Sequence, residues 1–442
     1  MKKNVFVPAM LLAIGASVWT GCSSNKTTSD EGKPAPAAEK AAPVEDKTPV
    51  TLTLLNGNGL SETDFQIMFV NPIQKKYPYI TVKLTSTTNI ANLITAGETP
   101  DLVATHNGNF GPYQELQLLY DMTELAKVNK LDLTRFDPIA MQAMAVTSPT
   151  ALNALPYALN FSALYYNKDL FDSFGVPYPK DGMTWDEAIE VGKRMTRKLG
   201  DTQIKGLDPY AVTRFQRILG NTFYDTKTNK STLNTPEWKF IFEHTKNILK
   251  IPGNEWTDAE TKNATSSEAN FYTKRTAAMY GGNNMHPKLG EPTKAGLNWD
   301  VAQYPSFPNR PGINTDVDAH LVFITSTSKH KDQAMKVLVE LTSNETEMEL
   351  ARKTARRTPL VDKQFEAAFA AELDYTKGKN NAGMFKSKMF NSPLRPRYTT
   401  EASNFLKAAF YDYYNGKDVN TALREADEKM NQFLTTAASG SK

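Results

Sequence analysis

Side chains that could bind a small polar ligand recur in the loops of this sequence. Recognition of a sugar needs amide, carboxylate and imidazole groups that bracket hydroxyls, together with aromatic rings that cover the apolar C–H faces of a pyranose. The candidate hydrogen-bonding residues are His106, Asn107, Asn109, Asn160, Asp208, Asn283, Asn284, Asp318 and His320. The candidate stacking residues are Tyr210, Trp299 and Tyr398. Each has a plainer alternative, since Asn and Asp also stabilise turns and aromatic residues also fill cores.

Basic residues near the C-terminus could add a preference for a charged ligand. Arg395 and Arg397 flank a proline and could fork onto a carboxylate, as in a uronic-acid oligosaccharide. Ion pairing at the surface is the alternative that we favour for them. A second basic group, at residues 352–357, lies near the end of a predicted helix, where the macrodipole stabilises cations, and is interpreted as a solvated face.

No catalytic or metal-binding motif accompanies these residues. The sequence contains no nucleophile elbow, no His-Glu-x-x-His, no phosphate loop and no Cys/His spacing typical of a metal site. We therefore expect no catalytic residue, no metal ion and no cofactor. The 48 acidic residues could still include a carboxylate pair, so a surface-anchored glycosidase or polysaccharide lyase is the competing interpretation.

The predicted strands place several candidates at strand ends. The alternation of apolar residues with threonines at residues 50–54 predicts a strand, and a helix and a second strand at residues 80–84 follow, which implies a parallel pair with a right-handed crossover. Residues 102–104 predict a third strand, which ends in the loop 105–111. Ligands of open α/β sheets gather at the carboxyl ends of strands, so we expect this loop to form a wall of the site.

The strongest local signals lie in residues 155–199. Residues 163–166 have the apolar and aromatic character of a strand, and Asn167 is placed to cap the short helix that follows. Thr184 and Glu187 form a capping box at the start of a further helix.

This stretch, with Y-A-L-N-F-S-A-L-Y-Y-N-K-D-L-F-D-S-F-G-V-P and T-W-D-E, resembles the central part of extracellular solute-binding proteins of family 1, the maltose-binding-like receptors of bacterial ABC importers. Residues 96–102, 206–210, 275–284 and 299–305 resemble further phrases of that family. The resemblance implies an α/β, type II periplasmic-binding-protein-like fold of two lobes, each a mainly parallel sheet with helices on both faces. It also implies that Asp208 and Tyr210 contact the sugar.

The resemblance further implies that each lobe is built from two separate parts of the chain. We expect residues 50–158 and 299–342 to form the N-lobe, and residues 159–298 and 343–442 to form the C-lobe. Such hinge-linked, discontinuous lobes can close on a ligand without unfolding either core.

The N-terminus predicts export and a lipid anchor. Two lysines precede an apolar run at residues 5–18 that has the length of a signal h-region, and small residues stand just before Cys22, the only cysteine. This resembles a bacterial lipoprotein signal, so residues 1–21 are expected to be removed and Cys22 to be acylated, for example with palmitate. The alternative is a plain secretory signal with an incidental cysteine. Residues 22–49, rich in small and polar residues, are expected to form a disordered tether.

The formal net charge of +3 is small, which argues against a nucleic-acid-binding protein. Together with the resemblance, these features predict a monomeric, non-enzymatic substrate-binding lipoprotein of an ABC importer, anchored at the extracellular face of the cytoplasmic membrane. It would capture a carbohydrate, in our interpretation an oligosaccharide, between its lobes and deliver it to the permease subunits. A receptor of the same fold for a peptide or another solute is a further alternative.

Overall fold

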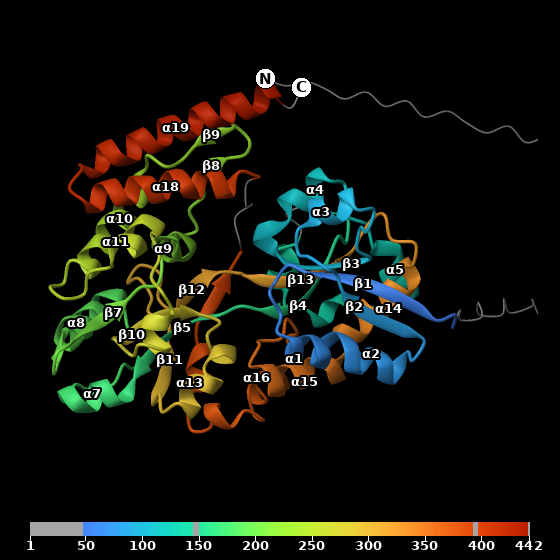
Figure 1. Cartoon of the computed structure of the whole chain (residues 1–442), viewed down its shortest axis with the longest axis horizontal. Coiled ribbons are helices and arrows are strands. Elements are labelled where there is room, and N and C mark those ends of the chain that lie inside the picture. The colour runs from blue at the N-terminus through green and yellow to red at the C-terminus, as the bar shows by residue number, and fades with distance from the viewer. Residues whose placement is uncertain (1–46, 145–149, 392–396, 441–442) are drawn as a thin grey trace, which may run out of the picture. The chain divides into compact units, whose positions relative to one another are not determined.

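The computed structural model describes residues 47–144, 150–391 and 397–440 (Figure 1). The chain divides into two units, Met1–Lys47 and Thr48–Lys442, and the second contains every element described below. The predicted signal, Cys22 and most of the predicted tether lie outside the described residues, as does Arg395.

The first lobe is built on a five-stranded sheet. Its strands, in spatial order, are β2 (Ile80–Leu84), β1 (Val50–Asn56), β3 (Leu102–His106), β13 (Ala319–Ile324) and β4 (Leu155–Leu159). The parallel pairing of β1 with β2 is confirmed, and β1 also pairs in parallel with β3. The helical elements of this lobe are α1 (Glu62–Phe65), η1 (Gln66–Val70), α2 (Asn71–Lys76), α3 (Ile90–Thr95), η2 (Asn107–Asn109), α4 (Gly111–Glu115), α5 (Thr123–Val128), η3 (Leu133–Arg135), α6 (Pro138–Gln142), α14 (Lys331–Leu341) and α15 (Asn344–Thr354).

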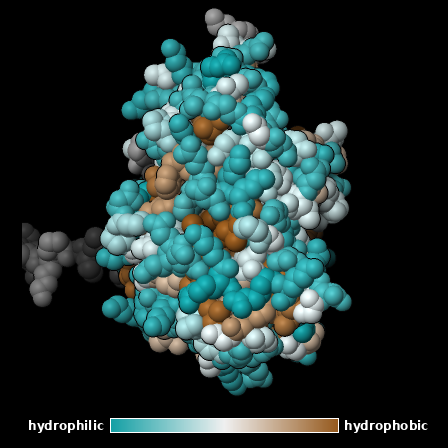
Figure 2. All heavy atoms as spheres, turned by 90° about the vertical axis from the view of Figure 1, so that its left-hand side faces the viewer, coloured by the Kyte–Doolittle hydropathy of each residue, from teal (hydrophilic) through white to brown (hydrophobic). Residues whose placement is uncertain are grey.

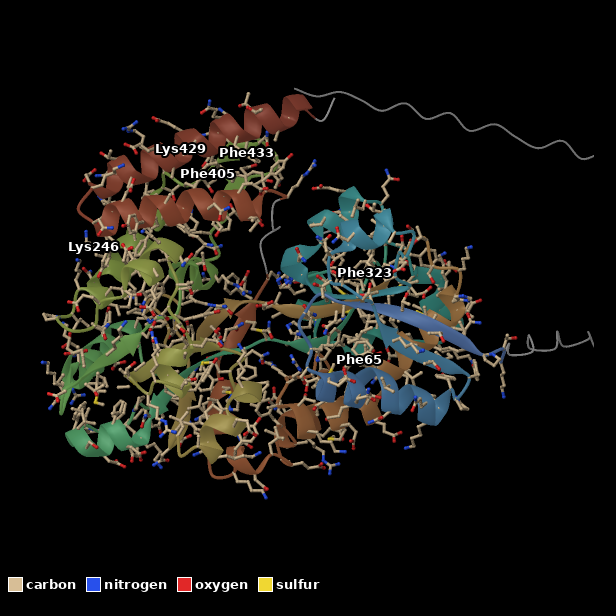
Figure 3. All side chains as sticks on the ribbon, in the orientation of Figure 1. Phe65, Lys246, Phe323, Phe405, Lys429 and Phe433 are labelled. Carbon is tan, nitrogen blue, oxygen red and sulfur yellow. The ribbon has the colours of Figure 1, made fainter. Side chains whose placement is uncertain are left out.

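Aromatic side chains of helices and strands pack together in the core of the first lobe. Phe65 packs against Phe69 where α1 passes into η1, with ring centroids 6.0 Å apart. Phe323 of β13 contacts Tyr113 of α4, with centroids 5.3 Å apart. Figure 3 shows Phe65 and Phe323 among different groups of helices, so this lobe has covered faces as the α/β class requires.

The second lobe is built on another five-stranded sheet. Its strands, in spatial order, are β11 (Trp299–Gln303), β5 (Ser162–Asn167), β10 (Ala277–Asn283), β7 (Thr202–Asp208) and β6 (Arg197–Leu199). Two small sheets, β8 (Tyr224–Asp225) with β9 (Lys230–Ser231) and β12 (Ile313–Asp316) with β14 (Lys388–Phe390), complete the strands. The helical elements of this lobe are α7 (Lys168–Phe174), α8 (Trp185–Met195), α9 (Val212–Leu219), α10 (Pro236–Leu249), α11 (Asp258–Asn263), α12 (Ala269–Tyr272), η4 (His286–Lys288), α13 (Gly290–Lys294), η5 (Asp374–Thr376), α17 (Asn381–Met384), α18 (Thr399–Tyr414) and α19 (Val419–Gly440). A further short helix, α16 (Gln364–Ala367), packs against α15 of the first lobe.

The second lobe has a separate core on each side of its sheet. Trp185 and Phe215 belong to one core, and Tyr165 and Trp299 belong to the other. The long helices α18 and α19 pack side by side, and Phe405 and Phe433 lie between them in Figure 3. Figure 2, which faces this lobe, shows a mostly hydrophilic surface on which hydrophobic side chains form small separate areas.

The sheets are mixed, whereas the sequence predicts mainly parallel ones. β13 runs antiparallel to both of its neighbours, and so does β5. The physical reason is the path of the chain. β5 follows directly after β4 of the first sheet, and β13 follows a segment that leaves the second lobe. Each of these two strands therefore begins at the edge of its sheet that faces the other lobe, where the neighbouring strands end.

The structure differs from the expected lobe boundaries at two points. The segment beginning at Trp299 does not return to the first lobe, because β11 pairs with β5 in the second sheet. The segment after residue 342 does not leave the first lobe at once, because α15 packs on η1 and Leu350 and Phe365 lie in the first core. Both segments carry apolar residues that suit either core, so only the long-range pairing distinguishes them.

Candidate functional site

Two short connectors bring the ends of the two sheets together. β4 ends at Leu159 and β5 begins at Ser162, so only Asn160 and Phe161 separate the two sheets along the chain. The second connector leads from β12 into β13. The backbone N–H of Asn160 donates to the carbonyl of Asp318, 2.8 Å away, which ties the connectors to each other. At these connectors the carboxyl ends of strands such as β3 and β10 therefore meet the amino ends of β5 and β13, which run antiparallel to them.

The first lobe contributes a partly polar edge to this meeting point. His106 at the end of β3 is paired in register with His320 of β13. Asn107 is buried, and its amide donates to the carbonyl of Val317 at 3.1 Å and accepts from the N–H of Ala319 at 3.3 Å. Asn107 thus fastens the second connector, while His106 and Asn109 are partly exposed.

His320 is almost fully buried at this edge. Its ring lies 5.9 Å from that of Tyr157, and its Nδ1 has no hydrogen-bond partner within the part of the chain that the structure describes. Burial, together with the positive charge of Arg356, lowers the pKa of His320 to about 3. The imidazole is therefore neutral at physiological pH.

The second lobe contributes Asn283, Asn284 and Tyr210. Asn283 ends β10 and accepts a hydrogen bond from the hydroxyl of Ser162 at 3.4 Å. Asn284 has a φ of 48° and anchors its backbone N–H on the carbonyl of Phe161 at 2.8 Å. Its side-chain oxygen is buried and has no hydrogen-bond partner among the described residues. Tyr210 follows β7, has a φ of 73° and is partly exposed.

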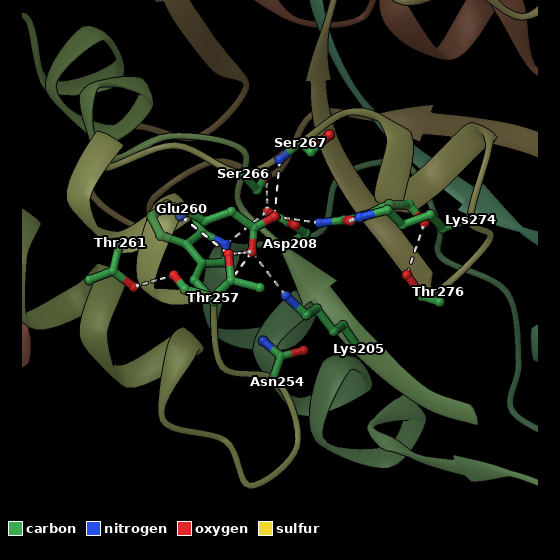
Figure 4. A network of polar contacts seen from close by, with 12 residues as sticks. Lys205, Asp208, Asn254, Thr257, Glu260, Thr261, Ser266, Ser267, Lys274 and Thr276 are labelled. Atoms are coloured by element: carbon green, nitrogen blue, oxygen red, sulfur yellow. Dashed lines mark hydrogen bonds and ion pairs between the residues drawn. The ribbon is translucent and has the colours of Figure 1, made fainter. Parts of the chain in front are cut away.

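Asp208 lies beneath this edge, in a network of polar contacts (Figure 4). Its side chain is 1% exposed, and Oδ1 accepts from the hydroxyl of Ser266 at 2.7 Å and from the backbone N–H of Tyr210 at 3.0 Å. Burial raises the pKa of Asp208 above its usual range. Through Oδ1, Asp208 holds the loop that carries Tyr210, while its Oδ2 is buried and has no hydrogen-bond partner among the described residues. The ligand contact that the resemblance implies for Asp208 stays a prediction.

Trp299 does not face the site. Its side chain is fully buried in the second lobe, its ring lies 5.2 Å from that of His286, and its indole N–H donates to the hydroxyl of Thr293 at 2.8 Å. The alternative of a core residue is the one observed, because Trp299 lies at the end of β11 away from the connectors, opposite Asn167 of β5.

The C-terminal candidates Arg397 and Tyr398 both have contacts within the chain. The ring of Tyr398 packs edge-on against Phe433, 5.1 Å away, and its backbone N–H donates to the hydroxyl of Tyr224. Arg397 is exposed and its Nε lies 2.5 Å from the carboxylate of Glu115, so the ion-pair alternative describes it. Its neighbour Arg395 lies outside the described residues.

Sequence reasoning missed three buried ion pairs, made by two arginines, where the lobes meet. Arg217 of α9 binds the carboxylate of Asp316, and its Nη1 lies 2.7 Å from Oδ2 of Asp318. Arg356, predicted to lie on a solvated face, is buried instead, and its Nη2 lies 2.6 Å from the carboxylate of Asp64. The partners are 99 to 292 positions apart in the chain, so no local signal could have found them.

Two kinds of feature are absent from the residues that the structure describes. Over residues 47–144, 150–391 and 397–440, no three His, Cys, Asp or Glu side chains are grouped so that they could hold a metal ion. Within the same ranges, every helix is too short or too polar to cross a membrane.

Comparison with known proteins places this geometry in a family context. Residues 59–348 match the family model for bacterial extracellular solute-binding proteins. The ABC substrate-binding protein Lmo0181 from Listeria monocytogenes, solved in complex with cycloalternan, superposes with a TM-score of 0.72 at 20% identity and covers 88% of this chain and 100% of its own. A sugar transporter from Rhizobium etli in an open conformation gives a TM-score of 0.68 at 20% identity, over 86% and 99%. The sugar-binding protein MalE from the phytopathogen Xanthomonas citri gives 0.65 at 17%, over 88% and 98%. These likenesses show the two-lobed fold.

Proposed function

The chain belongs to the family of bacterial extracellular solute-binding proteins, the non-enzymatic binding components of ABC transporters, and from this premise we propose that it captures an oligosaccharide between its two lobes. The bound sugar would then be delivered to the permease subunits of the importer. Sugars recur among the ligands of its structural neighbours, which include cycloalternan, mannobiose and α-D-tagatose. One neighbour binds glycerophosphocholine, which keeps a solute that is not a sugar as the second candidate.

The observation that carries the proposal is the set of polar, partly exposed side chains where the two sheets meet. These residues are His106, Asn109, Asn160, Tyr210, Asn283 and Asn284. Amides and imidazoles can bracket sugar hydroxyls, and the tyrosine ring can cover an apolar sugar face. A ligand that bridges both edges stabilises the closed arrangement of the lobes, because it gains contacts there that the open arrangement lacks.

The proposal includes a lipid anchor on Cys22 that keeps the protein at the extracellular face of the membrane. The support is the small-residue sequence before the only cysteine and the apolar run that precedes it. Labelling of producing cells with a palmitate analogue should mark the wild type and spare Cys22→Ser. Equal labelling of both would refute acylation at this residue.

The experiment that tests the function is a calorimetric and thermal-shift screen of the purified full chain. The panel contains neutral oligosaccharides, uronate oligosaccharides, peptides and glycerophosphodiesters, and recovered ligands are checked by mass. An intact sugar that raises the melting temperature supports the proposal, because a ligand that binds only the folded state stabilises it by mass action. Cleaved sugar would favour the glycosidase or lyase alternative, and a shift with peptides or phosphodiesters alone would replace the sugar with that solute.

A matched pair of variants tests the location of the site. Asn284→Gly removes the amide and still accommodates the positive φ. Asn229→Gly does the same at a φ of 53° in the exposed turn between β8 and β9. We expect weaker sugar binding only for Asn284→Gly, and equal affinities for both variants would remove Asn284 from the site.

A further inference from the structure

Two arginines of α9 differ in whether a carboxylate pairs with their guanidinium group. Arg217 is neutralised by two buried carboxylates. Arg214, one turn earlier, has no ion-pair partner among the residues that the structure describes. Its guanidinium lies over the ring of Tyr210, 4.9 Å from the centroid, and its Nη1 is buried with no hydrogen-bond acceptor in the described chain.

A second unsatisfied donor lies nearby. Tyr304 is 1% exposed, and its hydroxyl has no hydrogen-bond partner among the described residues. The ring of Tyr304 lies against Gly281 of β10, where a Cβ would meet Cε2 of Tyr304 at 3.4 Å and the carbonyl oxygen of Asp208 at 3.6 Å. Tyr304 therefore lies beside the end of β7, from which the chain continues through Tyr210 to Arg214. A buried donor without an acceptor destabilises the folded state, so native structures rarely leave two together.

The pairing of the strands places this cluster at the edge that faces the first lobe. Gln303 of β11 is in register with Ala163, next to the start of β5, so Tyr304 lies just beyond that edge. Tyr210 lies beyond the end of β7, and Arg214 belongs to the first turn of the helix that follows. The cluster thus adjoins the residues assigned above to the sugar site.

Within the described part of the chain, no negatively charged acceptor pairs with the donors of Arg214 and Tyr304. The cluster offers a charged N–H and an uncharged O–H, and a carboxylate can accept from both with its two oxygens. The protein supplies carboxylates to two other buried arginines, Arg217 and Arg356, whereas no carboxylate of the described residues pairs with Arg214. A neutral sugar hydroxyl would satisfy one donor and leave the charge unmatched.

We propose that Arg214 and Tyr304 bind the carboxylate of an acidic carbohydrate, so that the preferred ligands of this protein are uronate-containing oligosaccharides. The inference rests on the proposed sugar-binding function and narrows it. Tyr210 positions the guanidinium by stacking and covers the sugar ring beside it. The charge therefore selects the ligand class, and the asparagines recognise hydroxyls.

The test compares uronate oligosaccharides with their methyl esters, which keep the scaffold and lose the charge. By titration calorimetry, the wild-type full chain should bind an acid at least about tenfold more tightly than its ester. Arg214→Gln should weaken acid binding by about ten- to a hundredfold, the loss expected for a charge-assisted hydrogen bond, and leave ester binding within about twofold. Arg194→Gln, at an exposed arginine of α8 in the same lobe, should change neither affinity.

Tyr304→Phe is the second variant, because it removes only the hydroxyl of a buried ring. It should lower the ratio of acid to ester affinity severalfold, and it keeps the test decisive if Arg214→Gln does not fold. Binding of neutral sugars or esters by the wild type as tightly as acids would overturn the inference and leave the proposed function standing. Equal losses for acid and ester in Arg214→Gln and in Tyr304→Phe would also overturn it. Failure of every carbohydrate to bind would refute the proposed function itself.

Discussion

Replacement of Arg217 by methionine should destabilise the protein through the two carboxylates that it leaves behind. The side chains of Arg217, Asp316 and Asp318 are only 11%, 5% and 9% exposed. Methionine keeps much of the volume of the arginine stem and removes the charge. Because the carboxylates stay buried without their cation, the variant loses more than the net value of the ion pairs.

The magnitude follows from the burial of this cluster. Removal of one member of a buried ion pair costs about 3 to 5 kcal/mol. A unit of roughly 400 residues has an unfolding entropy of about 0.8 kcal/mol/K, at about 2.1 cal/mol/K per residue. Arg217→Met should therefore lower the melting temperature by about 4 to 6 °C.

Differential scanning calorimetry checks this value against two further variants. Arg424→Met removes an exposed i,i+4 pair with Glu428, whose side chains are 52% and 61% exposed, and should shift the melting temperature by less than about 1 °C. Adding Asp316→Asn and Asp318→Asn to Arg217→Met should recover more than half of the loss. If Arg217→Met melts like Arg424→Met, or if the added asparagines recover nothing, uncompensated charge is not the cause.

Three further changes test the buried titratable groups. Burial raises the pKa of Glu347 well above 4.5. The folded state therefore retains a proton that the unfolded state releases, so the stability of the protein falls as the pH rises above 4.5. In urea titrations, Glu347→Gln should be more stable than the wild type at pH 8 and close to it at pH 4. The pKa of His320 is lowered to about 3, so the protein loses stability as the pH falls below about 6.5, where the histidine of the unfolded chain takes up a proton. His320→Gln should flatten the dependence of the free energy of unfolding on pH below about 6.5. An unchanged slope would contradict the burial of a neutral ring. Asp208→Ala should lower the melting temperature, because Ser266 and the N–H of Tyr210 lose their acceptor, at a cost of about 1 to 3 kcal/mol. An unchanged melting temperature with weaker sugar binding would contradict the structural role and support the predicted ligand contact of Asp208.

Local features of the fold were predictable because their signals lie within a few residues. The capping box of Thr184 and Glu187 is present, and the side chain of Asn167 caps α7 by accepting from the N–H of Leu170. The strands at residues 50–54, 80–84 and 102–104 also form where alternation or apolar runs predict them. In each case the chain chooses its conformation from neighbours in sequence, so the pattern carries the information.

The lobe to which a segment belongs was not predictable in the same way. The residues of β11 would suit a strand in either sheet, and only the pairing of Trp299 with Asn167 assigns it to the second. Arg356 has the sequence context of a solvated helix end, yet its partner Asp64 lies 292 positions away. Burial and pairing over such separations depend on the whole fold, so residue type alone could not reveal them.

The contrast between Arg214 and Arg217 shows why the ligand-binding residues could not be identified from the sequence alone. The two are the same residue type, one turn apart on α9, and the sequence treats them alike. Arg217 reaches the carboxylates that precede β13, whereas Arg214 reaches the ring of Tyr210 and finds no acceptor among the described residues. An arginine that is already paired with carboxylates has no free charge to add to the binding of a ligand. An arginine without such a partner contributes more to binding when the ligand supplies the negative charge. Loss of Arg217 should therefore change the melting temperature, and loss of Arg214 should change which ligand is bound.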